Sequence, residues 1–71
     1  MRKVNRPVEI LLVEDSPSDT DLTIEAFQEG GIPSNLSHVE DGVEAMEFLG
    51  RKNFYVNAPR PDLILLDLNL P

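Results

Sequence analysis

The chain has 71 residues and a mass of 7.9 kDa, which limits it to one small domain with a thin hydrophobic core. Its 13 acidic residues outnumber its 6 basic ones and give a net charge of −7, which argues against binding nucleic acid or an anionic membrane through bulk charge. It has no cysteine and a single histidine, so disulfides, thiolate metal sites and histidine cages are excluded, and any metal must be held by oxygen.

The amino terminus carries Arg2, Lys3 and Arg6, but no apolar segment of signal-peptide length follows before Glu9 and Glu14. No apolar run approaches the roughly 20 residues that are needed to cross a bilayer. We therefore expect a cytoplasmic chain that is not a membrane protein.

The first predicted element is a strand over residues 8–13, an apolar run that leads into Glu14 and Asp15. The run has no polar alternation, which is typical of a strand buried on both faces of a parallel sheet. Ser16 as N-cap and Pro17 at the first helical position then predict the start of a helix.

This helix, which we expect to end near Glu29, has two chemically different faces. The helical spacing assigns Leu22, Thr23, Ala26 and Phe27 to the packing face and Asp21, Glu25 and Gln28 to the face in water. Gly30-Gly31 and Pro33 then favour a turn, because glycine accepts positive φ and proline cannot continue the helix.

A second strand is predicted over residues 35–39, and its polar composition indicates an edge or near-edge position. His38 is interpreted as a residue of this strand. Asp41 and Glu44 then have the spacing of a capping box, which predicts a second helix that ends at Gly50.

Residues 51–60 are expected to form a connection that is longer than the roughly two to six residues usual in such units. Phe54 and Tyr55 lie in this connection, and we expect them to pack on their own domain rather than face a partner. A third strand follows over residues 63–66, as apolar as the first, and leads into Asp67.

The alternation of strands and helices predicts an α/β fold built from parallel βαβ units. Right-handed crossovers allow the second and third strands to lie on opposite sides of the first, in the order 2-1-3. In that order Glu14, Asp15 and Asp67 share one edge of the sheet, where open α/β sheets bind their ligands.

Three neighbouring carboxylates repel one another unless a cation lies between them. Because only oxygen donors are available, Mg²⁺ is the expected occupant. The structural alternative is that Asp67 caps the next turn while Glu14 and Asp15 only solvate a strand end. Acids after two matching apolar runs favour a binding site over that alternative.

Three segments of the sequence resemble the response regulator receiver domain of two-component signalling, and together they cover nearly the whole chain. They are Ile10-Leu11-Leu12-Val13-Glu14-Asp15, Asp41-Gly42-Val43-Glu44-Ala45 and Pro61-Asp62-Leu63-Ile64-Leu65-Leu66-Asp67-Leu68-Asn69-Leu70-Pro71. The resemblance implies a flavodoxin-like fold, a parallel sheet with helices on both faces. Residues 1–71 would be the amino-terminal part of a single receiver domain.

The resemblance also implies a phosphoryl-accepting signalling role rather than an enzyme. By motif match Asp67 is the phosphoacceptor and a Mg²⁺ ligand, and Asp15 is a direct Mg²⁺ ligand. Glu14 is implied to act through water, and the backbone carbonyl of Asn69 is a further ligand. The implied partner is a sensor histidine kinase. The residues after the first strand and the long connection over 53–60 resemble receivers that partner phytochromes.

The sequence stops after the third strand, so the family's hydroxyl residue of the fourth strand and lysine of the fifth have no counterpart in it. Residues 63–66 would then have unpaired backbone groups along an apolar strand, and such edges recruit partners. We expect that the 71 residues do not form a stable monomer alone. The third strand should pair with the remaining half of the domain or with another chain, in a swapped or oligomeric sheet.

Three other functions are weighed against a receiver. A hydrolase with an aspartyl-phosphate intermediate would also place Asp67 after an apolar strand, but such enzymes typically resemble Asp-x-Asp, and the second position here is Asn69. A nucleotide-binding Rossmann unit needs a glycine-rich turn where this chain has Glu14-Asp15-Ser16-Pro17. A receiver-like interaction module without phosphorylation would be distinguished by Mg²⁺ binding, which a receiver loses when its acids are changed.

Overall fold

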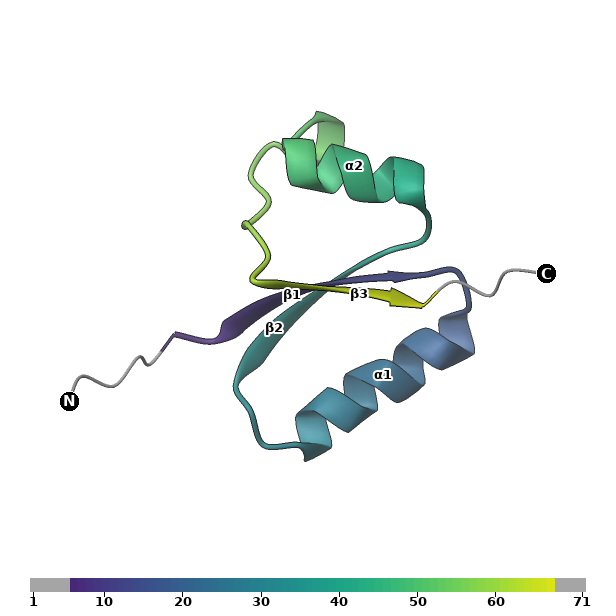
Figure 1. Cartoon of the computed structure of the whole chain (residues 1–71), viewed down its shortest axis with the longest axis vertical. Coiled ribbons are helices and arrows are strands. Elements are labelled where there is room, and N and C mark those ends of the chain that lie inside the picture. Colours follow the sequence, from purple (N-terminus) through teal and green to yellow (C-terminus); the bar gives the residue numbers. More distant parts are fainter. Residues whose placement is uncertain (1–5, 68–71) are drawn as a thin grey trace.

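The structure is a computed structural model that describes residues 6–67. Its elements alternate between strands and helices, as predicted, with one added 3₁₀ turn, η1 (Figure 1). They are β1 (Val8–Glu14), α1 (Pro17–Glu29), β2 (Ser34–Val39), α2 (Gly42–Gly50), η1 (Asn53–Tyr55) and β3 (Leu63–Asp67). No helix within residues 6–67 is both long and apolar enough to span a membrane.

The three strands form a parallel sheet in the order β2-β1-β3, which confirms the predicted 2-1-3 arrangement. Figure 1 shows α1 and α2 on opposite faces of this sheet. The central strand is paired on both sides, with Ile10 opposite Leu36 of β2 and opposite Leu63 of β3. The described residues therefore have the flavodoxin-like α/β fold expected from the sequence.

The hydrophobic core is centred on β1, whose residues from Ile10 to Val13 are all buried. Successive strand residues face opposite sides of a sheet. On one side, Leu11 and Val13 pack with the α2 residues Ala45 and Phe48. β1 is apolar at consecutive positions because helices lie on both faces of the sheet, as predicted.

Both helices begin at the predicted caps. The Ser16 side chain accepts a hydrogen bond from the Asp19 N–H at 3.4 Å, and Asp41 accepts one from the Glu44 N–H at 2.8 Å. The Glu44 carboxylate reaches back to the N–H of Glu40 at 2.8 Å, one residue before the cap. These bonds satisfy backbone donors that have no partner inside the helix.

The predicted packing face of α1 is partly wrong. Leu22 is 64% exposed and Ala26 is also exposed. Thr23 and Phe27 are half-buried, as predicted, and they are joined on this face by the half-buried Ile24 and the buried Thr20, which were not predicted. Hydrogen bonds at Thr20 fix the rotation of the helix, because its hydroxyl contacts both the Ser16 carbonyl and the ring of His38.

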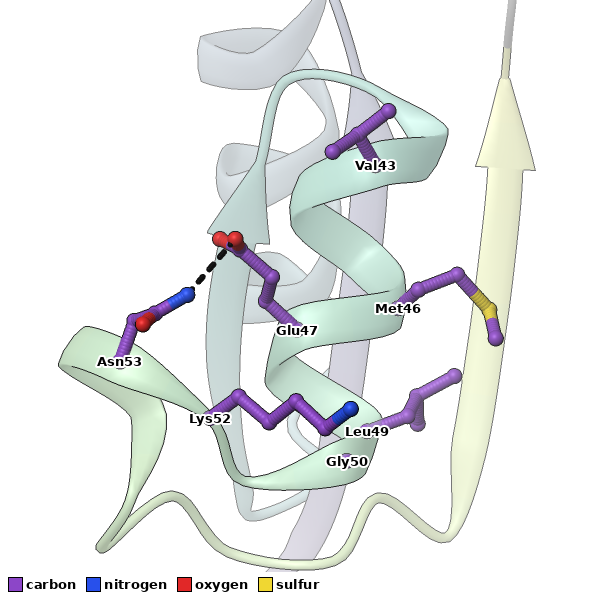
Figure 2. Close-up of a pocket in the computed structure, with 7 residues that line it drawn as sticks. All are labelled: Val43, Met46, Glu47, Leu49, Gly50, Lys52 and Asn53. Atoms are coloured by element: carbon purple, nitrogen blue, oxygen red, sulfur yellow. Dashed lines mark hydrogen bonds between the residues drawn. The ribbon is translucent and has the colours of Figure 1, made fainter.

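The expectation that β3 is buried on both faces is not met in the described structure. Leu66 is 71% exposed, and Leu63 and Ile64 are also exposed. Within residues 6–67, β3 is an edge strand that pairs only with β1. Figure 2 shows Met46 and Leu49 extending from α2 on the side of β3, and both are exposed. An apolar surface thus extends over these two elements.

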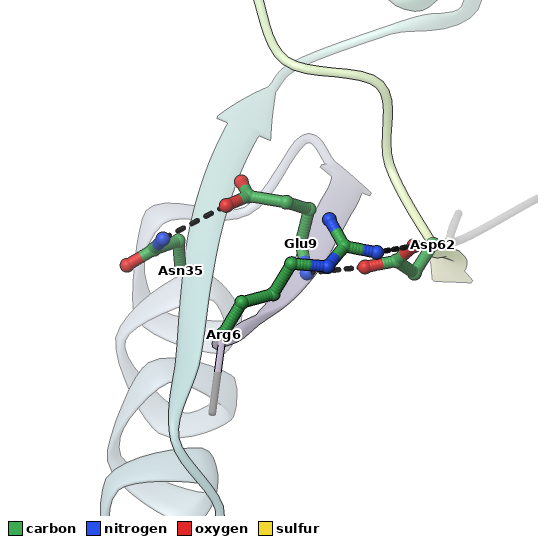
Figure 3. A network of polar contacts seen from close by, with 4 residues as sticks. All are labelled: Arg6, Glu9, Asn35 and Asp62. Carbon is green, nitrogen blue, oxygen red and sulfur yellow. Dashed lines mark hydrogen bonds and ion pairs between the residues drawn. The ribbon is translucent and has the colours of Figure 1, made fainter. Parts of the chain in front are cut away.

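Hydrogen bonds and an ion pair connect the beginning of β3 to β1 at the amino edge of the sheet (Figure 3). The Asp62 carboxylate accepts a hydrogen bond from the Glu9 N–H at 2.9 Å and forms an ion pair with Arg6 at 3.4 Å. Asn35 of β2 donates to the Glu9 carboxylate at 2.8 Å. The network therefore connects β2, β1 and the residue before β3 at the amino edge of the sheet, opposite the edge where Glu14 and Asp67 lie.

The two aromatic residues of the long connection behave differently. Tyr55 packs on Phe48, with ring centroids 5.2 Å apart, and its hydroxyl donates to the Glu44 carboxylate at 2.5 Å. Phe54 is 97% exposed, so the expectation that both rings pack on their own domain is wrong for Phe54. The hydrogen bond raises the pKa of Tyr55 to about 12, and the same bond is the main reason why the pKa of Glu44 is lowered.

Changing Tyr55 to Phe should remove this hydrogen bond and keep the ring contact with Phe48. We expect the free energy of unfolding to fall by about 1 kcal/mol at neutral pH, the usual net value of such a bond. The unfolded tyrosine loses its proton near its ordinary pKa of 10.0, but the folded one only near 12. The stabilisation of the folded state by the Tyr55 hydroxyl is therefore fully present below pH 10 and is lost as the pH rises toward 12.

Denaturant unfolding of the two proteins across this alkaline range checks the prediction. The stability difference between wild type and Tyr55→Phe should shrink as the pH rises, because only the wild type has the tyrosine proton to lose. A difference that stays constant up to pH 12 would contradict the assigned hydrogen bond.

Candidate functional site

The acids predicted to form a site lie at the carboxyl edge of the sheet. Glu14 is the last residue of β1, Asp67 is the last residue of β3, and their Cα atoms are direct partners in the parallel register. Neighbouring strands are about 4.8 Å apart. The chain therefore brings these two acidic positions, far apart in sequence, to adjacent strand ends.

The two consecutive acids after the first apolar run have opposite environments. The side chain of Glu14 is 0% exposed, whereas Asp15 is exposed. One carboxylate oxygen of Glu14 accepts a hydrogen bond from the Ser16 N–H at 3.1 Å, which folds the chain back at the strand end. Because consecutive residues of an extended chain point in opposite directions, only one of the two acids can turn inward.

His38 of β2 lies against the same strand end. Its Nε2 atom is 2.7 Å from the Glu14 carbonyl oxygen and 3.2 Å from the Thr20 hydroxyl. The Thr20 hydroxyl itself donates to the Ser16 carbonyl at 2.9 Å. This small network connects β2, the end of β1 and the first turn of α1.

A depression of about 240 Å³ lies beside this network, at the junction of the strand ends and α1. Its lining includes the carboxylate-bearing residues Asp15, Asp21 and Glu40, together with His38 and Thr20. The exposed acid of the pair thus lies on an acidic concave surface, which attracts cations and repels anions.

Part of the predicted ligand set lies outside the described residues. The backbone of Asp67 is described but its side chain is not, and Asn69 lies beyond residue 67. Among the side chains that the structure describes, no three of His, Cys, Asp or Glu are grouped closely enough to hold a metal ion. The predicted convergence of Glu14, Asp15 and Asp67 therefore stays a prediction, supported at the level of the backbone register.

The contacts of His38 and Thr20 were not predicted from the sequence. His38 is a strand residue, as interpreted, but its ring also reaches the end of the neighbouring strand. The available signal was its position at the carboxyl end of β2, one residue before Val39. The polar composition of this segment placed His38 on an edge or near-edge strand but could not reveal its hydrogen-bond partner 24 residues away.

Comparison with known proteins begins at the sequence level. No protein-family model matches the chain. Response regulator Rcp1 of Synechocystis sp. is 51% identical over 67 residues, which are 94% of this chain and 46% of that protein. The chain therefore spans about half the length of this relative.

Two solved structures share the fold. A crystal structure of the phosphorylated cyanobacterial phytochrome response regulator RcpA matches with a TM-score of 0.81 and 48% identity, over 93% of this chain and 47% of that one. The Mn²⁺-bound form of response regulator Rcp1 matches with a TM-score of 0.82 and 51% identity, over 92% of this chain and 47% of that one.

Sequence and fold agree in these comparisons. The identity of 51% extends over 94% of the chain, and the fold match with RcpA covers 93% of it. Over nearly its whole length the chain is therefore a homologue of part of a response regulator, and its described residues have the β1-α1-β2-α2-β3 arrangement of the flavodoxin-like receiver fold.

Proposed function

We propose that the protein is a receiver of two-component signalling that accepts a phosphoryl group on Asp67, and that residues 1–71 are the amino-terminal part of a single receiver domain. The observation that carries this proposal is the register of the sheet. It pairs the Cα atoms of Glu14 and Asp67 at the carboxyl edge, with Asp15 next to them in sequence.

The donor chemistry of this edge fits a hard divalent cation. Glu14, Asp15 and Asp67 offer carboxylate oxygens, and Asn69 offers a backbone carbonyl, which are the ligands that Mg²⁺ prefers. The Mn²⁺-bound form of Rcp1 supports a divalent cation here. When bound, Mg²⁺ neutralises phosphoryl oxygens, so that an anionic carboxylate can approach them.

The proposed chemistry of the chain itself is a single group transfer. A carboxylate oxygen of Asp67 attacks the phosphorus of a phosphohistidine, an O–P bond forms, and the N–P bond breaks. The electron pair of that bond stays on the imidazole, which can then take a proton from solvent. Asp67 ends as an acyl phosphate, whose added charge and acceptor oxygens can bias a neighbouring two-state element. The role is signalling rather than repeated turnover.

The proposed partner is a sensor histidine kinase. The description of RcpA as a phytochrome response regulator supports a phytochrome as that kinase. The acidic lining around Asp15 also disfavours nucleic acid as the ligand of this edge. We place the exchange in the cytoplasm, where the ATP that supplies a histidine kinase is present.

Phosphorylation with a small labelled acyl phosphate tests this function. The protein, expressed from its complete reading frame, should take up label when Mg²⁺ is present and should take up none in excess chelator. Hydroxylamine should then release the label, because it cleaves acyl phosphates but leaves phosphoserine intact. Label that survives hydroxylamine, or that forms equally well in chelator, would overturn the proposal.

A further inference from the structure

We propose that His38 is a positioning residue for the acidic pair at the end of β1. Its Nε2–H group holds the Glu14 carbonyl and thereby fixes the backbone from which the carboxylates of Glu14 and Asp15 project. This inference rests on the proposed cation site, because it assigns His38 a part in the affinity of that site.

The hydrogen-bond geometry determines which ring nitrogen carries the proton. The Glu14 carbonyl, 2.7 Å from Nε2, can only accept a hydrogen bond. A bare nitrogen at that distance would bring two lone pairs together, so Nε2 must be protonated. The Thr20 hydroxyl, 3.2 Å away, gives its own proton to the Ser16 carbonyl and therefore accepts from the same Nε2–H. His38 thus donates one shared hydrogen bond.

The shared hydrogen bond fixes both sides of Asp15. On one side, His38 contacts the carbonyl of Glu14. On the other, the Ser16 carbonyl receives the Thr20 hydroxyl and the Thr20 N–H, each at 2.9 Å. The Glu14–Asp15 and Ser16–Pro17 peptide units, which lie before and after Asp15 in the chain, are therefore connected through Thr20 and His38, although the Asp15 side chain is exposed.

Such fixation matters for a cation because ligands held in place before binding lose less freedom on binding. Outer residues that orient metal ligands typically change metal affinity by about 10- to 100-fold when they are mutated. His38 orients the backbone of two ligands rather than a ligand side chain. We therefore expect an effect near the lower end of that range.

Two substitutions separate the hydrogen-bond donor from the bulk of the ring. His38→Leu replaces the ring with an apolar side chain of similar size and removes the hydrogen-bond donor. His38→Gln keeps an N–H group near the position of Nε2. Asn35→Ala is the matched control, because Asn35 is also an exposed residue of β2 whose side chain donates to β1, but at the opposite edge (Figure 3).

Mn²⁺ affinity is measured on the protein expressed from its complete reading frame. The concentration of free Mn²⁺ is determined by electron paramagnetic resonance. Thermal unfolding of each variant shows that it is folded at the temperature used. We expect His38→Leu to bind Mn²⁺ about tenfold more weakly. His38→Gln should recover most of the affinity, and Asn35→Ala should bind as the wild type does. This pattern would support the donor role.

Unchanged Mn²⁺ affinity in folded His38→Leu, or equal losses in the Leu and Gln variants, would overturn the inference. Asp15→Asn tests the cation site independently of His38. If Asp15→Asn binds Mn²⁺ with the same affinity as the wild type, the proposed function is overturned, and this inference with it. ¹⁵N chemical shifts of the imidazole then report the tautomer without any metal, and a neutral ring protonated only on Nδ1 would refute the hydrogen-bond assignment by itself.

Discussion

The Asp67→Asn variant is expected to take up no label from a small acyl phosphate or from a phosphorylated histidine kinase. An amide oxygen is a far poorer nucleophile than a carboxylate, and the amide also carries no charge to bind a cation. Because the proposed reaction has one acceptor, the expected effect is complete loss. Quantifying the phosphorylated fraction by intact-protein mass spectrometry gives the result directly.

Asp62→Asn is the matched control for this experiment. Asp62 precedes the same strand that Asp67 ends, but it lies at the amino edge of the sheet, where it accepts the Glu9 N–H. An asparagine oxygen can accept the same hydrogen bond, so the strand should stay in place. Normal labelling of Asp62→Asn beside unlabelled Asp67→Asn is the expected pair. Labelling of Asp67→Asn at the wild-type level would place the acceptor elsewhere.

The 71 residues expressed alone are expected to sediment as an oligomer rather than as a 7.9 kDa monomer. In the described structure β3 pairs only with β1, so its outer edge has backbone groups available to another strand. Leu66 on this strand is 71% exposed. A second copy that adds its own β3 would bury this apolar surface, which is the dominant favourable term in association.

Leu66→Lys should shift this segment toward the monomer. Losing one buried leucine removes about 1.5–3 kcal/mol, which weakens association at least about tenfold, and paired lysines would add repulsion. Ile32→Lys is the control, because Ile32 is 62% exposed but follows α1, away from β3. Analytical ultracentrifugation of the three proteins gives the comparison. Cooperative unfolding together with monomeric sedimentation of the unmodified segment would show that the edge argument is wrong.

Much of the fold follows from local sequence patterns. The caps at Ser16 and Asp41, the apolar runs of β1 and β3, and the alternation of elements predicted the order and the parallel topology that the structure shows. These features depend on residues within a few positions of each other, or on the near-obligatory right hand of βαβ crossovers. They can therefore be predicted from the sequence without knowledge of contacts between distant residues.

The rotation of α1 could not be predicted in the same way. The helical pattern gave a polar face correctly, but Leu22 and Ala26 were assigned to the packing face and are exposed. Thr20, a polar residue, is buried because its hydroxyl has partners in Ser16 and His38. Burial of a polar group depends on whether a partner is in place, and one partner here comes from another strand.

For the candidate site, the sequence by itself determined that acids follow two apolar strands and that any cation there would be held by oxygen. Only the tertiary structure decided that Glu14 is buried while Asp15 is exposed, and that His38 contacts the end of β1. The physical reason is the range of the interactions. Composition and periodicity report on neighbours along the chain, whereas the burial and hydrogen bonds of a strand end are set by side chains that folding brings from elsewhere in the sequence.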